Sequence, residues 1–229
     1  MRLLQVCNVG QICGGTAACA WTITRALPEW RHSVAFLSPP TAETIDAFRP
    51  CGVATWDTVD AARVLALRPD LLILHNTPRQ RSPELPPVLT IQYLHSRLDP
   101  SSADVTVACS RWLADQYPAE RCDGVLCQPV PRPPQDEHAQ ARPLRDRLVV
   151  GRLCTPTPRK WPSELIPFYA RLAAAHPLVD WEFVGAPSGL VAPLTGACGG
   201  RARFHPAGWS ARRHLARWDA LLYHHPTLT

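Results

Sequence analysis

Short apolar segments alternate with helical stretches along this chain, and this alternation constrains its fold more than any other feature. In the first half, the apolar segments are expected to be strands at residues 2–7, 33–37, 71–74, 88–93 and 105–109. Apolar residues at three-to-four-residue spacing predict helices between several of them, at residues 17–27, 57–67 and 110–117. Strands that are apolar throughout are typical of a parallel sheet that helices cover on both faces. The sequence therefore predicts an α/β protein with doubly wound parallel sheets.

The composition changes between residues 129 and 145, where the chain is rich in proline and polar residues and has no apolar period. We interpret this segment as a stiff linker. After it, strands are expected at residues 147–150, 181–184, 203–205 and 220–223, with helices capped by Ser163 and Ser210. We therefore predict an N-terminal Rossmann-like domain at residues 1–128, a linker at 129–145 and a partial C-terminal Rossmann-like domain at 146–229.

The last strand is expected at an edge of the second sheet. In a doubly wound sheet the fourth strand lies beside the first, and later elements cover it. Only six residues follow residues 220–223, so this apolar edge would be exposed. A partner chain would cover it if the protein is split.

The composition is that of a folded protein. Hydrophobic residues make up 46% of the chain and charged residues 19%, which excludes a disordered class. No apolar run approaches the roughly 18 residues of a membrane span, and the first residues lack the cleavage site of a signal peptide. The nine cysteines form no Cys-x-x-Cys pair, and their odd number argues against a disulfide framework. We interpret the chain as a soluble, cytoplasmic protein.

Basic charge is concentrated in the second half. The first 145 residues hold 14 arginines and 14 acidic residues, whereas residues 146–229 hold ten basic and five acidic residues. This excess indicates an anionic ligand in the second domain, and a solvated basic surface is an equally weighted alternative. The basic residues are not interleaved with aromatic ones, so nucleic-acid binding is not predicted.

Two segments have the chemistry to hold phosphate groups. Gly14-Gly15-Thr16 joins the first strand to the first helix, where backbone amides can point at a ligand that approaches closely. Its spacing matches neither a dinucleotide-binding nor a Walker motif, and a simple tight turn is the alternative. Arg152 and Lys160, the single lysine, flank a proline-bearing loop at the carboxyl end of a strand. A guanidinium and an ammonium there would bind a diphosphate, and an exposed basic loop is the alternative.

Histidines follow several strands at the carboxyl ends, where ligands bind in open parallel sheets. His95 comes after the fourth apolar segment, and His75 and Asn76 come after the third. Such histidines can bind a substrate hydroxyl or carry a proton, and for each alone a structural role is the alternative. His224 and His225 follow the last strand, but no cysteine, aspartate or glutamate nearby completes a metal shell. No metal site is predicted.

The order of these segments carries a resemblance to a known family. In the first domain the matching segments are Leu4-Gln5-Val6-Cys7-Asn8-Val9-Gly10 with Gly14-Gly15-Thr16, Arg68-Pro69-Asp70-Leu71-Leu72-Ile73-Leu74-His75-Asn76, and Ala103-Asp104-Val105-Thr106-Val107-Ala108-Cys109-Ser110. In the second they are Val149-Val150-Gly151-Arg152-Leu153 with Lys160, and Trp181-Glu182-Phe183-Val184-Gly185. Together they resemble the retaining GT-B glycosyltransferases of family four (glycosyl transferases group 1), over nearly the whole chain.

The resemblance implies that the first domain binds the acceptor and the second binds a nucleotide-sugar donor. It assigns Arg152 and Lys160 to the donor diphosphate, Gly14 and Gly15 to closing over it, and His95 to the donor sugar. The family needs no metal or other cofactor, because cationic side chains and helix N-termini neutralise the leaving diphosphate. Transfer would retain the configuration of the sugar, and the acceptor is not identified.

Two features depart from the family pattern. The loop between Arg152 and Lys160 is elongated, and the family's paired glutamates would follow directly after Thr229. We therefore expect a glycosyltransferase truncated at its C-terminus, whose activity at this length stays open. The alternative is a non-catalytic GT-B remnant that acts as a binding or scaffold protein, or half of a split enzyme. A GT-B sugar-nucleotide epimerase is a third hypothesis.

Overall fold

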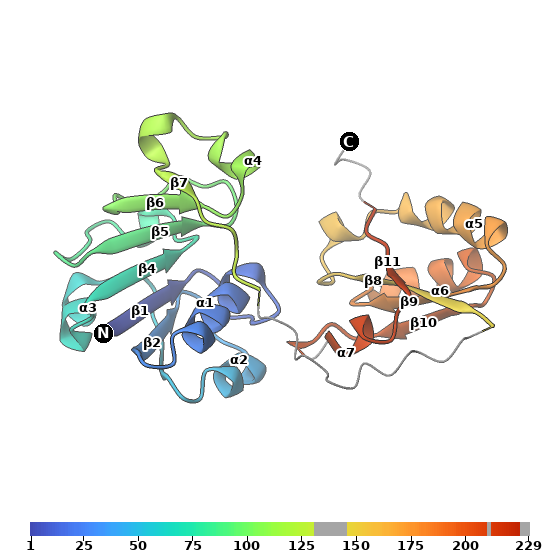
Figure 1. The fold of residues 1–229 in the computed structure, drawn as a ribbon, viewed down its shortest axis with the longest axis horizontal. Helices are drawn as coiled ribbons and strands as arrows, with labels where there is room; N and C mark the ends of the chain where they lie inside the picture. The colour runs from blue at the N-terminus through green and yellow to red at the C-terminus, as the bar shows by residue number, and fades with distance from the viewer. Residues whose placement is uncertain (131–145, 210–211, 225–229) are drawn as a thin grey trace. The chain divides into compact units, whose positions relative to one another are not determined.

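The computed structural model describes residues 1–130, 146–209 and 212–224, and the chain divides into two compact units between Pro134 and Gln135 (Figure 1). One unit contains a sheet of seven parallel strands and the other a sheet of four. This confirms the predicted α/β fold with two doubly wound sheets. The division falls within the predicted linker, most of which lies outside the described residues. In the described part of the chain, no helix has the length and apolar content of a membrane span.

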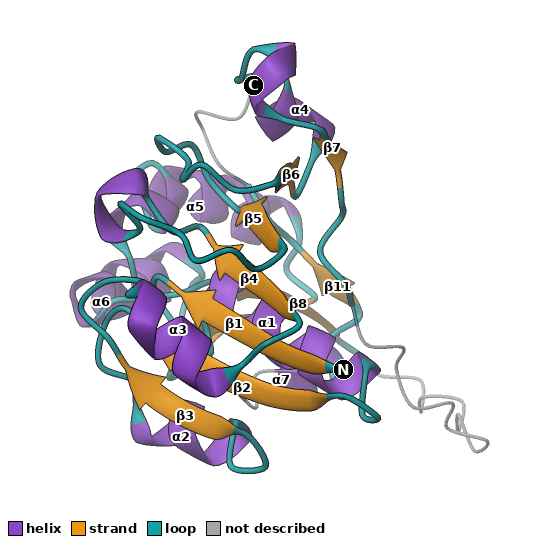
Figure 2. Cartoon of the chain, turned by 90° about the vertical axis from the view of Figure 1, so that its left-hand side faces the viewer, coloured by secondary structure: helices purple, strands orange, loops and turns teal. Residues whose placement is uncertain are grey.

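The first sheet has the strand order β3-β2-β1-β4-β5-β6-β7 (Figure 2). All five strands predicted in this half are present, whereas β3, β7 and α2 were not predicted. The strands are β1 (Arg2–Cys7), β2 (Arg31–Phe36), β3 (Gly52–Thr55), β4 (Leu71–His75), β5 (Thr90–Leu94), β6 (Val105–Ala108) and β7 (Gly124–Val125). The helices are α1 (Gly15–Ala26), α2 (Ala42–Ala47), α3 (Ala61–Leu67) and α4 (Arg111–Ala114).

Side-chain caps set the starts of two predicted helices. Asp60 Oδ1 accepts hydrogen bonds from the N–H groups of Ala62 and Arg63, so α3 begins later than residue 57. Ser110 Oγ accepts from the Leu113 N–H at the start of α4. Both side chains pair amides that have no partner within their helix.

The first sheet is covered on both faces. Leu3 in β1 packs with Cys19 of α1, whereas its neighbour Leu4 packs with Val64 of α3. Because successive side chains of a strand point to opposite faces, α1 and α3 lie on opposite sides of the sheet (Figure 2). Gln5 therefore points to the same face as Leu3, toward α1.

The second sheet has the strand order β10-β9-β8-β11. Its strands are β8 (Leu148–Leu153), β9 (Val179–Val184), β10 (Ala202–His205) and β11 (Ala220–Leu221), and its helices are α5 (Leu165–Ala175), α6 (Ser188–Ala197) and α7 (Arg212–Leu215). As predicted, the fourth strand pairs with the first, and Leu221 on this edge is 57% exposed. The Ser163 cap is wrong, because its hydroxyl donates to Glu164 and α5 begins without a side-chain cap. Ser210 lies outside the described residues.

The two faces of the second sheet differ in character. Trp181 and Phe183 pack under α5 and α6 in an aromatic core. On the opposite face, Trp218 follows α7 and donates its indole N–H to Glu182 of β9 at 2.7 Å. The indole packs directly on Gly151 of β8, where a Cβ would lie 2.0 Å from the ring.

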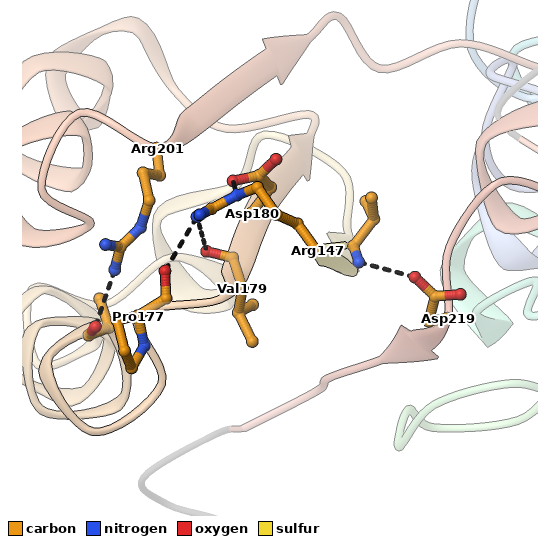
Figure 3. A network of polar contacts seen from close by, with 8 residues as sticks. Arg147, Pro177, Val179, Asp180, Arg201 and Asp219 are labelled. Atoms are coloured by element: carbon orange, nitrogen blue, oxygen red, sulfur yellow. Dashed lines mark hydrogen bonds and ion pairs between the residues drawn. The ribbon is translucent and has the colours of Figure 1, made fainter. Parts of the chain in front are cut away.

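Polar contacts join the amino ends of these strands (Figure 3). Arg147, just before β8, donates to the Asp180 carboxylate of β9 at 2.8 Å. Asp219, just before β11, accepts from the N–H of Val149 at 2.7 Å. Arg201, before β10, donates to a carbonyl at the end of α5 at 2.7 Å. Each contact links the start of one strand to a neighbouring element.

Gly151→Ala is expected to destabilise the second unit by about 1–3 kcal/mol, because the new methyl group forces Trp218 off the sheet. The matched control is Gly196→Ala in α6, where nothing lies within 4 Å of the position of a Cβ. That change is expected to stabilise the helix by about 0.5–1 kcal/mol. Urea unfolding, with hydrogen exchange to report on the β8 amides, measures both. Equal stability of the two variants would contradict the close packing of Trp218 on β8.

Candidate functional site

The carboxyl edge of the first sheet has the topology of a ligand site. Successive strands run outward from β1 through β2 to β3, and the chain then returns to add β4 on the other side of β1. Open parallel sheets bind ligands at this reversal, beyond the carboxyl ends of the strands. The loop of residues 8–15 follows β1, His75 ends β4, and His95 follows β5. The Asn8 N–H donates to the His75 carbonyl at 3.3 Å, so the first two of these segments touch.

The glycine loop leads into α1 without a side-chain cap. The Gly14 N–H donates to the Gln11 carbonyl at 2.9 Å, and Gly14 is the N-cap residue of α1. The first turn of this helix contains no acidic residue. The buried Thr16 hydroxyl has no hydrogen-bond partner among the described residues. The start of α1 therefore offers amides and a positive dipole end to an anionic group.

A chain of hydrogen bonds runs from Gln5 inside the unit to Gln128 at its surface. Gln5 Nε2 donates to Thr24 Oγ1 at 2.9 Å and to a carbonyl of α1 at 3.1 Å, so Gln5 Oε1 is the acceptor for His75 Nε2 at 3.0 Å. His75 then accepts at Nδ1 from His95 Nε2 at 3.2 Å. His95 accepts at Nδ1 from the side-chain amide of Gln128. We assign both histidine tautomers from this order of donors and acceptors.

Burial keeps both imidazoles neutral. His75 is fully buried, and desolvation together with the neighbouring His95 lowers its pKa well below the usual value. Desolvation lowers the pKa of His95 to about 4. Each histidine accepts a hydrogen bond in this chain, which only the neutral ring can do. The burial and the hydrogen bonds therefore favour the same protonation state.

Asn76 holds the backbone that carries His95. It has a φ of 54°, a left-handed conformation that asparagine tolerates better than most residues. Its Oδ1 accepts from the N–H groups of His95 and Ser96, both at 3.0 Å, and its Nδ2 donates to the Ser96 hydroxyl at 2.8 Å. The residue after β4 thereby fixes the loop after β5.

The sequence reasoning missed Gln5 and Gln128. A signal for Gln5 was present, because a polar side chain in the middle of a buried strand needs an internal partner. Gln128 carries no such signal, since it follows β7 in an exposed loop. Its amide lies 3.5 Å from the position that a Cβ of Gly15 would take. The structure thus brings the predicted residues Gly15 and His95 together around Gln128.

Arg152 is fully buried, and its guanidinium binds the protein's own backbone. Its Nη1 donates to the His224 carbonyl at 2.8 Å and its Nη2 to the Lys160 carbonyl at 2.7 Å. The guanidinium lies 5.1 Å from the ring centroid of Trp161 and 4.7 Å from that of Tyr223. Arg152 therefore ties the loop after β8 to the segment after β11.

Lys160 is partly exposed at the end of a short 3-10 helix, Pro158–Lys160. The Arg152 guanidinium donates to the backbone carbonyl of Lys160. The structure therefore brings these two predicted residues together, but through the backbone of Lys160 and not through its ammonium group. Burial raises the pKa of the Cys154 thiol, and the positive charges of Arg152 and Lys160 offset part of this rise. Gly185, with a φ of 81°, lets the end of β9 approach this loop, since a Cβ there would lie 1.9 Å from the Cys154 carbonyl oxygen.

His224 has a packing role in this unit. Its ring stacks on Phe168 of α5 with the centroids 4.2 Å apart. His225 lies outside the described residues. The ring contact and the carbonyl bond to Arg152 give His224 a structural role, which was the alternative considered for the site histidines.

Two groups in the described part of the chain have ligand-type atoms within 4.8 Å of one another: Cys19 with His75 and His95, and Glu182 with His205 and His214. The first is poorly suited to a metal, because burial raises the pKa of the Cys19 thiol to about 12 and the thiolate is the ligand form. Its two histidines are also paired with each other. The second group joins three elements that are distant in sequence, so no local spacing could have predicted it.

Comparison with solved structures identifies the fold. The chain is similar to HepE from Anabaena, solved in complex with UDP, with a TM-score of 0.66, 17% identity, and coverage of 97% of this chain and 74% of that one. It is also similar to a glycosyltransferase from Rickettsia africae, with a TM-score of 0.71, 10% identity, and coverage of 96% and 72%. A UDP-N-acetylglucosamine 2-epimerase, described as putative, from Listeria monocytogenes gives a TM-score of 0.52, 7% identity, and coverage of 96% and 73%.

These structural similarities establish the GT-B-like architecture of two Rossmann-type units, and at such low sequence identity they establish the fold alone. The chain spans about three quarters of the length of each of these proteins. No protein-family model matches the sequence, and no curated protein matches it. The fold is shared by transferases and by an epimerase, so it does not by itself select an activity.

The neutral histidines predict a loss of stability in acid. Their folded-state pKa values lie below the unfolded value of about 6.5, so their stabilisation is fully present above that pH and is lost as the pH falls toward about 4. Each proton taken up on unfolding contributes a slope of about 1.4 kcal/mol per pH unit. His95→Gln removes one of these protons. The free energy of unfolding, measured with urea between about pH 7 and 5, is therefore expected to fall less steeply with decreasing pH in the variant. An unchanged slope would contradict the neutral assignment of His95.

Proposed function

We propose that the chain is a glycosyltransferase of the retaining GT-B family-four type, which takes a sugar from a nucleotide-diphosphate donor. The proposal rests on the resemblance of the ordered motifs, supported by the GT-B-like fold. HepE, one of the similar structures, contains UDP, and we carry this ligand class over as a hypothesis. The acceptor stays unassigned.

Among the structural observations, the state of His95 supports the proposal most directly. Its Nε2 is occupied by His75, and its Nδ1 lone pair faces the exposed amide of Gln128. A sugar hydroxyl is also a hydrogen-bond donor, so we infer that it replaces the Gln128 amide at Nδ1. Gln5 and His75 are positioning residues in this proposal, because they keep the ring neutral and its acceptor directed outward.

The phosphate contacts are divided between two kinds of donor in this proposal. Gly15 offers a backbone amide at the start of α1, and Lys160 offers a partly exposed ammonium. The Gly14 N–H already donates to the Gln11 carbonyl, so direct contact of Gly14 with the diphosphate stays a prediction. Lys160 would stabilise the negative charge of the leaving diphosphate. The resemblance implies that this stabilisation needs no metal ion. Direct contact of Arg152 with the diphosphate stays a prediction. Its two hydrogen bonds to carbonyls support a positioning role for the Lys160 loop.

Lys160→Ala is expected to weaken the binding of a nucleoside diphosphate about tenfold or more, since a charge-assisted hydrogen bond contributes roughly 1.5–3 kcal/mol. Calorimetric titration with UDP, GDP and ADP measures this and also tests which base is preferred. Arg171→Ala removes the same charge from the exposed face of α5 and is expected to change affinity by about twofold at most. Equal affinity of the Lys160 variant and the natural chain would remove Lys160 from the site.

His95→Ala is expected to leave UDP affinity within about twofold, because UDP lacks the sugar, but to reduce turnover of a nucleotide sugar by about 100-fold. His95→Gln keeps an acceptor oxygen and is expected to lose less. Product analysis separates the hypotheses: transfer or hydrolysis releases the nucleotide, whereas an epimerase returns an altered nucleotide sugar. A natural chain that binds UDP but turns over no nucleotide sugar would indicate the non-catalytic binding protein.

A further inference from the structure

A cluster of ionisable side chains lies on the α7 face of the second sheet. Glu182 comes from β9, His205 ends β10, and His214 lies in α7. One ligand-type atom of each residue lies within 4.8 Å of those of the other two. Glu182 and His214 are 5% and 4% exposed. A carboxylate and two imidazoles from three separate elements therefore share one small, mostly buried volume.

The distance between His205 and Glu182 suits two ligands of a tetrahedral metal better than a hydrogen bond. His205 Nε2 lies 3.5 Å from Glu182 Oε2, and this buried nitrogen has no hydrogen-bond partner among the described residues. Zinc–ligand bonds of about 2.0–2.1 Å at tetrahedral angles separate neighbouring ligand atoms by roughly 3.3 Å. The two imidazole centroids are 4.3 Å apart, so the rings are already adjacent.

Arg217 competes for the same groups. Its Nη2 donates to His214 Nδ1 at 2.7 Å and lies 3.4 Å from Glu182 Oε2, and its side chain is 52% exposed. A neutral imidazole has one lone pair, which Arg217 uses here. A metal on either nitrogen of His214 therefore requires Arg217 to release the ring. A half-exposed arginine can do so by turning its charged end into solvent.

We propose that Glu182, His205 and His214 form a binding site for a divalent transition-metal ion of the zinc class, with Arg217 as its internal competitor. Two imidazoles and one carboxylate are a ligand set that zinc takes in sites with one remaining open position. The Trp218 indole N–H bonds to the Glu182 carboxylate at 2.7 Å and orients it. The ion would connect β9, β10 and α7, so it would stabilise the second unit. The proposal is independent of the proposed transferase activity.

The test is zinc binding by the full 229-residue chain. The natural chain is expected to bind one zinc ion more than His205→Gln or His214→Gln, and cobalt at this site is expected to show the visible spectrum of tetrahedral coordination. His176→Gln, which removes an exposed histidine at the end of α5, is the matched control and is expected to bind as the natural chain does. Excess zinc is expected to raise the unfolding temperature by about 5 °C or more in the natural chain but not in His205→Gln.

Arg217→Ala provides a test that does not depend on deleting a ligand. Removal of the competing guanidinium is expected to tighten zinc binding about tenfold or more, and near-ultraviolet circular dichroism verifies that each variant is folded. Equal zinc stoichiometry in the natural chain and in His205→Gln would overturn the proposal. Zinc binding confined to the Arg217 variant would also overturn it, because the arginine would then hold the cluster in the natural protein.

Discussion

The hydrogen bond between Gln5 and His75 determines the chemistry at the edge of the first sheet. Gln5 lies in the middle of β1 between Leu4 and Val6 and is fully buried, so its amide has to find partners inside the unit. Since its NH₂ group bonds to α1, its oxygen faces His75 and sets that tautomer. His75 in turn sets the tautomer of His95. One buried amide thus decides that His95 presents a lone pair, and not a proton, at the surface.

Buried polar groups in the second unit follow the same physical rule. The excess of basic residues there indicated an anionic ligand, yet four of the arginines bind the protein itself. Arg152 and Arg201 donate to carbonyls, and Arg147 and Arg217 to carboxylates. A charge count therefore overstates the positive charge that a ligand meets. Lys160, partly exposed at the carboxyl end of β8, is the cation on which the proposed diphosphate contact depends.

The fold could be predicted because its signals are local. Short apolar strands, helical spacing and turn residues identified fourteen of the eighteen strands and α-helices in the described part of the chain, and parallel topology followed from their order. The elements that were missed are short or half-exposed, such as β7 and α2, where the apolar period is weak. The helix α6 was missed because Pro193 and two glycines interrupt its pattern. The Ser163 cap failed because its hydroxyl bonds to the adjacent Glu164 and not to a helix amide.

By itself, the sequence determined the α/β class, the two series of alternating strands and helices, and the placement of His95, Gly15 and Lys160 at carboxyl ends of strands. These features can be read from the sequence because the period of a strand and the chemistry of a turn depend on only a few neighbouring residues. Only the tertiary structure decided which side chains meet. The pairing of Gln5 with His75 joins positions 70 residues apart, and the group of Glu182, His205 and His214 joins three separate elements. Such contacts depend on strand order and register, which set the distance between residues that no local pattern connects.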